Sequence, residues 1–187
     1  MRGIDGAHGE ALVADLESAL RDLAAPIERD PALWSRGLPR RWTAGQHTEH
    51  IAASMDLSAA PFEAAVAKLR DGTLPPVPGR GPLQSLWVVT ILRMMPTGGR
   101  AHPATRPGTT PEREVVAARI ARTLERHRAV VAALAAGERD RLWIANPYIP
   151  RFRFALRWHY NLPEMLRVHA VHARHHAHLI EAIAGRV

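Results

Sequence analysis

Leucines recur every three or four residues near the start of the chain, at Leu12, Leu16, Leu20 and Leu23. This spacing puts the four side chains on one face and predicts an amphipathic helix over residues 9–23. Pro26 and Pro31 follow. Because proline has no backbone N–H, we expect these prolines to close the helix and open a loop.

A second helix is predicted to begin with Thr43 as its N-cap. Gln46, three residues later, completes the capping-box pattern. Helical spacing then continues through Leu57. Pro61 is expected either to kink this helix or to start a second helical piece that reaches about Leu69.

The middle of the chain is rich in proline and glycine. Residues 71–82, DGTLPPVPGRGP, are expected to form a linker that cannot stay helical. The apolar run over residues 83–95, LQSLWVVTILRMM, fits either a helix or a strand. Residues 96–111 are expected to form a long loop, and a loop of this length in a compact domain usually serves a function.

A third long helix is predicted from Thr110 as N-cap, with Pro111 in the first helical position and Glu112 in the first turn. Gly137 is the expected stop. The stretch 146–158 is expected to be irregular. A final helix should then run from about Leu162 to Ala184.

Four long helices with long connections predict an all-α fold, an antiparallel four-helix bundle. The 187 residues fit a single domain over residues 1–187, and the hydrophobic content of 47% is ordinary for a globular protein. The chain has no cysteine, which excludes disulfides, thiolate ligands and a cysteine nucleophile.

The formal net charge of +7 raises the question of nucleic-acid binding. Arginine supplies nearly all of this charge, with Lys68 as the single lysine, and acidic residues are interleaved with it. No helix-turn-helix, zinc finger or basic–aromatic alternation is recognisable, so we expect no nucleic-acid partner. The acidic N-terminal stretch and the shortness of every apolar run predict a cytoplasmic protein without a membrane partner.

Five of the eleven histidines lie in HAVHARHHAH, residues 169–178. On a helical wheel, His169 and His176 fall within roughly 60° of His172, on the side that carries Met165 and Ile183. The same wheel turns His178 toward solvent and leaves His175 at the margin. Imidazoles that face a core need partners for their ring nitrogens.

The pair His172 and His176 has two interpretations. The His-x3-His spacing places two rings one turn apart, within reach of a single metal ion. Hydrogen-bonded core histidines would give the same pattern. In the second helix, His47 and His50 share a face with Ile51. One further inward histidine would complete a site with three nitrogen ligands and one open position, the usual catalytic arrangement.

Two short motifs resemble a known family. WTAGQHTEHI, residues 42–51, is similar to the opening motif of the DinB-like (YfiT-like) superfamily, and HARHH, residues 172–176, is similar to the motif in its last helix. The resemblance extends over nearly the whole chain, including the long loop before the third helix. It implies a four-helix bundle of the DinB/YfiT type with an unusual connection order and a metal site of three histidines.

Carried over by position, the implied ligands are His50, His172 and His176. The family often has a glutamine three residues after the last ligand, where this chain has Leu179. His47 is not a usual ligand position, and it is either a candidate catalytic base, a residue that supports a ligand, or a partly buried polar side chain.

The resemblance further implies a divalent metal such as zinc or nickel, and an enzyme that is a metal-dependent hydrolase or a thiol S-transferase acting on a small-molecule substrate. The metal would activate water or a low-molecular-weight thiol. The alternative is a non-catalytic bundle that binds a metal or small ligand at a vestigial site. Arginines in the loops 100–106 and 151–157 are candidates for binding a substrate carboxylate. Either a monomer or a homodimer is compatible with the sequence.

Overall fold

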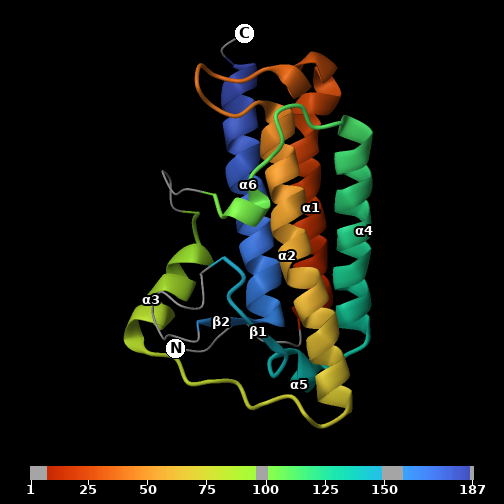
Figure 1. Cartoon of the computed structure of the whole chain (residues 1–187), viewed down its shortest axis with the longest axis vertical. Helices are drawn as coiled ribbons and strands as arrows, with labels where there is room; N and C mark the ends of the chain where they lie inside the picture. The colour runs from red at the N-terminus through yellow and green to blue at the C-terminus, as the bar shows by residue number, and fades with distance from the viewer. Residues whose placement is uncertain (1–7, 96–100, 149–157, 186–187) are drawn as a thin grey trace.

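The structure is a computed structural model that describes residues 8–95, 101–148 and 158–185. Four long helices lie side by side: α1 (Gly9–Arg29), α2 (Ala44–Arg70), α4 (Arg113–Ala132) and α6 (Leu162–Ala184) (Figure 1). Their apolar faces meet in one core, in which Leu16, Met55 and Met165 are fully buried. The mostly helical architecture confirms the predicted all-α class.

The helices α1 and α6 run parallel to each other. Asp15, in the first half of α1, pairs with Arg167 and Arg174 in the first half and middle of α6, whereas Arg29 pairs with Glu181 near the end of both helices. Surface ion pairs of this kind each contribute little to stability. Their order nevertheless defines the relative direction of the two helices.

The helices α2 and α4 form a second parallel pair. Asp56 pairs with Arg119, and about two turns further along both helices Glu63 pairs with Arg126. The two pairs run in opposite directions (Figure 1). The prediction was an antiparallel four-helix bundle, with an unusual connection order implied by the resemblance. In the structure, neighbouring helices are antiparallel only between the two pairs, so the chain must return along the bundle between α2 and α4.

That return is the long connection of residues 71–112. It contains α3 (Pro82–Ile91), which stands beside the bundle, and the short 3-10 helix η3 (Pro103–Thr105) (Figure 1). The apolar run that fitted either a helix or a strand is therefore helical over residues 82–91. The turn η3 packs against α2, and this contact places a backbone carbonyl group beside the inward histidines.

A small hairpin precedes α6. Strands β1 (Trp143–Ala145) and β2 (His159–Asn161) pair antiparallel, with Ile144 opposite Tyr160. Most of the stretch predicted to be irregular, 149–157, lies outside the described residues. The helix α6 begins and ends as predicted, and the side chain of Asn161 caps it by accepting the N–H of Glu164.

The prediction that Pro26 closes the first helix was wrong, whereas the predicted helical reach to about Leu69 beyond Pro61 was confirmed. The helix α1 continues through Pro26 to Arg29, and α2 continues through Pro61 to Arg70. Proline removes one helical hydrogen bond. In both helices the next residue, Ile27 or Phe62, is buried in the core, and this burial offsets the cost.

The boundaries of α4 also differ from the prediction. Glu112, not Thr110, is the N-cap, because the carbonyl of Pro111 accepts a hydrogen bond from the indole of Trp34 and stays in the loop. The helix ends at Ala132, before Gly137, which lies in the separate short helix α5 (Ala136–Arg139). No helix in the described ranges is long and apolar enough to span a membrane.

Candidate metal centre

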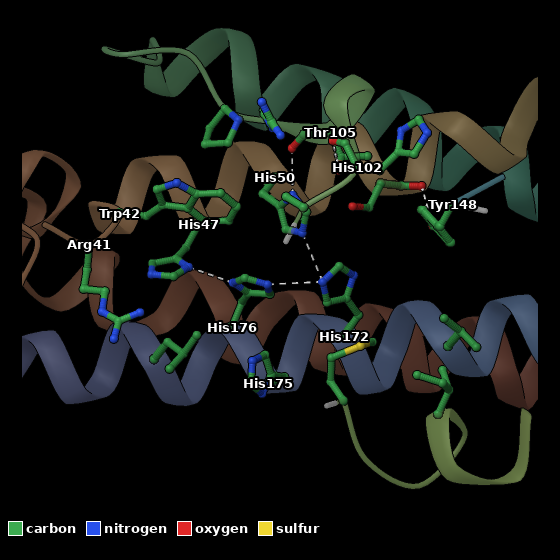
Figure 2. A pocket seen from close by; sticks show the side chains of 18 of the residues that line it. Arg41, Trp42, His47, His50, His102, Thr105, Tyr148, His172, His175 and His176 are labelled. Carbon is green, nitrogen blue, oxygen red and sulfur yellow. Dashed lines mark hydrogen bonds between the residues drawn. The ribbon is translucent and has the colours of Figure 1, made fainter. Parts of the chain in front are cut away.

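Three histidines from two helices converge inside the bundle (Figure 2). The Nε2 atom of His172 lies 3.2 Å from that of His50 and 3.2 Å from that of His176. One ligand atom from each ring lies within 4.8 Å of the other two. The three residues named from the resemblance are therefore brought together and could hold a metal ion.

Local sequence explains this convergence. The capping box of Thr43 and Gln46 fixes the start of α2 one turn before the first histidine, as predicted. On α6, the one-turn spacing puts His172 and His176 above each other on one face. Because α2 and α6 are antiparallel, His50 lies level with this pair.

The ring of His50 is held by the connection before α4. Its Nδ1–H donates a hydrogen bond to the carbonyl of Thr105, with 2.7 Å between the nitrogen and the oxygen. A carbonyl only accepts, so Nδ1 carries the proton and Nε2 has a free lone pair. This is the tautomer that binds metals, and a backbone carbonyl is a common partner for a histidine ligand.

The ring of His176 has its own partner. Its Nδ1 lies 2.7 Å from the Nδ1 of His47, and both rings are buried. Two neutral imidazoles can share this bond in two ways. When His176 donates, its Nε2 is free for a metal and His47 keeps its proton on Nε2. When His47 donates, the Nε2 of His176 is protonated and cannot be a ligand.

Burial strongly favours neutral imidazoles at this site. Desolvation, followed by repulsion from neighbouring imidazoles, lowers the pKa of His47 to about 4 and the pKa of His172 to about 3. The same causes lower the pKa of His176, and desolvation also lowers the pKa of His50. Neutral rings are the form that binds a metal ion.

The three histidines line a pocket of about 1130 Å³. Trp42 packs against this cluster, with its ring centroid 5.0 Å from that of His50. Apolar side chains from α3 and α6, among them Trp87 and Ile183, form part of the wall. Leu179, which occupies the position of the family's glutamine, also lines the pocket and supplies no amide.

A second buried polar cluster lies deeper in the bundle, and the sequence did not reveal it. The hydroxyl of Ser58 lies 2.8 Å from the Nε2 of His169 and 3.1 Å from that of His127. All three side chains are buried. The inward position of His169 was predicted, but its partners come from α2 and α4 and could not be read from one helix.

Some of the other residues singled out in the sequence line the pocket, whereas others are exposed or lie outside the described residues. His175 is half-buried at the pocket, and His178 is exposed, as the wheel indicated. Of the candidate arginines, Arg106 lines the pocket, whereas Arg100 and residues 151–157 lie outside the described residues.

The chain was compared with family models, curated proteins and solved structures, and no match was found in any of the three. The assignment to the DinB-like superfamily therefore stays a prediction from the two motifs. The function has to be argued from the geometry of the site itself.

Proposed function

We propose that this protein is a metal-dependent enzyme of the DinB-like superfamily. His50, His172 and His176 hold one divalent metal ion in the proposal, and the pocket beside them receives a small-molecule substrate. The observation that carries it is the convergence of the three rings at a large pocket. The two parallel helix pairs, joined by a long return connection, support the family assignment because the resemblance implies an unusual connection order.

The donor set fits a metal ion better than an ordinary hydrogen-bond network. His50 must present a lone pair at Nε2, since its proton is on Nδ1. The Nε2 of His172 has at most one proton, yet it lies 3.2 Å from two other ring nitrogens. One proton on His172 cannot form good hydrogen bonds to both of the other ring nitrogens, whereas a cation can bind a lone pair from each of the three rings. Tetrahedral ligands with zinc–nitrogen bonds of 2.0–2.1 Å lie about 3.3 Å apart.

Three imidazole ligands leave a coordination position open toward the pocket, which is the arrangement of catalytic sites. A divalent ion bound there would lower the pKa of a water molecule or a low-molecular-weight thiol and supply a nucleophile at neutral pH. His47 is assigned a supporting role, because the tautomer that frees His176 for the metal leaves a proton on the Nε2 of His47. In that state His47 is a hydrogen-bond donor to the pocket and not a base.

The proposal is tested by metal analysis of untagged protein. The wild-type protein should bind about one equivalent of zinc or nickel, both of which suit imidazole ligands. His172→Ala should lose this metal while its circular dichroism spectrum stays helical. His178→Ala, an exposed histidine on the same helix, is the matched control and should retain the metal. Equal metal content in both variants would contradict the assignment.

Activity separates the enzyme from a non-catalytic binder. Metal-loaded protein should hydrolyse an activated ester or transfer a thiol such as cysteine to an electrophilic arene, and His172→Ala should lose that activity. A stoichiometric metal with neither activity would favour the alternative of a metal-binding bundle with a vestigial site.

A further inference from the structure

Three arginines line the same pocket: Arg40, Arg41 and Arg106. Among the described residues, the wall also contains six histidines and no aspartate or glutamate. The carboxylate of Glu49 accepts the backbone N–H of Gly108, and Glu49 is not among the described residues that line the wall. The pocket is therefore lined by permanent positive charge without a matching acid.

Several other arginines in the described ranges are neutralised by an acidic partner. Arg80, Arg119, Arg126 and Arg174 each pair with a carboxylate. Among the described residues, no ion pair involves any of the three pocket arginines. An arginine that lines a concave site and has no acidic partner is available to bind an anion, because its planar fork of N–H donors matches carboxylate and phosphate groups.

The turn that carries two of these arginines is unusual. The N–H of Arg41 bonds to the carbonyl of Leu38, and Arg40 has a φ of 58°, in the left-handed region. Glycine or asparagine is the common residue at such a turn position, because a side chain is disfavoured there. Arg40 is the single non-glycine residue with positive φ in the described part of the chain.

Apolar and aromatic side chains form another part of the wall. In Figure 2, Arg41 and Trp42 lie at one end of the pocket and Tyr148 lies at the other, with the histidines between them. Trp87 adds a large aromatic surface. Near Tyr148, the buried hydroxyl of Ser54 lines the pocket and has no hydrogen-bond partner among the described residues. A ligand for this pocket needs an apolar body as well as an anionic group.

We propose that Arg40, Arg41 and Arg106 form a subsite for the carboxylate, sulfonate or phosphate group of a substrate whose apolar or aromatic body lies along the tryptophan wall. Placing this substrate's reacting atom at the three histidines rests on the proposed function, whereas anion binding itself does not. The subsite would orient the substrate by its charged end.

The test uses a pair of fluorescent probes that differ in charge. Anilinonaphthalene sulfonate has an aromatic body and one anionic group, and phenylnaphthylamine has the same body without the charge. The wild-type protein should bind the sulfonate probe more tightly than the neutral probe, and added salt should lower the affinity of the sulfonate probe alone. Replacing Arg40, Arg41 and Arg106 together by glutamine should weaken the sulfonate about tenfold or more, since each exposed ionic contact contributes roughly 2- to 5-fold.

Two controls make the result specific. Arg122→Gln removes an exposed arginine of α4 that is not in the pocket and should leave both affinities unchanged. Arg40→Gly removes one charge from the turn but suits its backbone, so it should weaken sulfonate binding without lowering the melting temperature.

The binding experiments test the anion subsite independently of the proposed metal centre. Equal sulfonate affinity in the wild-type protein and the triple variant would overturn the subsite. The subsite would also be overturned if the triple variant lost affinity for the neutral probe as strongly as for the sulfonate probe. A protein that binds no metal but loses sulfonate binding in the triple variant would keep the subsite and refute the proposed metal centre.

Discussion

Removing the imidazole of His47 should weaken metal binding although His47 is not a proposed ligand. The bond between its Nδ1 and that of His176 is 2.7 Å long and buried. In His47→Ala, the metal-binding tautomer of His176 would leave a buried N–H without a partner, which costs about 1–3 kcal/mol. A loss of this size corresponds to roughly 5- to 150-fold in affinity, which includes the roughly 10- to 100-fold range typical when a partner of a metal ligand is removed.

The assay is a competition titration of zinc between the protein and a chromophoric chelator. His47→Asn should keep most of the affinity, because the amide oxygen lies near the position of Nδ1 and can accept the same hydrogen bond. His175→Ala is a further control, since its ring packs on His176 with centroids 5.3 Å apart and no hydrogen bond between them is present. Wild-type affinity in His47→Ala, or an equal loss in His47→Asn, would refute the reasoning.

Three further predictions concern stability, measured by urea unfolding of metal-free protein. The pKa of His47 is lowered to about 4 in the folded protein, so as the pH falls below about 6.5 the unfolded chain binds a proton at this residue before the folded protein does. The contribution of His47 to the free energy of unfolding should therefore drop by about 2 kcal/mol between pH 8 and pH 5. A free energy of unfolding that does not change with pH would contradict burial of a neutral ring. Phe62→Ala should cost about 3–5 kcal/mol, since Phe62 is fully buried directly after Pro61; a loss under about 1 kcal/mol would argue against a continuous α2. Glu164→Gln should lower the free energy of unfolding by about 3–5 kcal/mol because it leaves Arg80 without its buried partner. Glu181→Gln, at an exposed ion pair, should lower it by less than about 1 kcal/mol. Similar losses in the two variants would show that burial does not determine how much an ion pair contributes to stability.

Much of the candidate metal centre could be predicted from local patterns. The one-turn spacing of His172 and His176 and their position among apolar residues follow from helical geometry alone, because both lie on one helix. The ligand from α2 was named from the resemblance, and the chain direction of α2 against α6 then brings it level with them. Helix α6 and the capping box of α2 were predicted correctly for the same reason, since their signals are local in the sequence.

The parts that sequence reasoning missed depend on contacts between distant segments. The carbonyl of Thr105 reaches His50 only because the long return connection crosses α2. Arg40 and Arg41 face the pocket because of a turn with an unusual backbone, which no periodic pattern indicates. Pro26 failed as a helix stop because core burial of Ile27 outweighs a lost backbone hydrogen bond.

X-ray absorption spectroscopy of the zinc-loaded protein tests the central claim most directly. Three imidazole ligands should appear, with zinc–nitrogen distances of about 2.0 Å, and His172→Ala should remove one of them or abolish binding. A spectrum without imidazole scattering, or one that is unchanged in His172→Ala, would contradict the convergence of His50, His172 and His176 on a single ion.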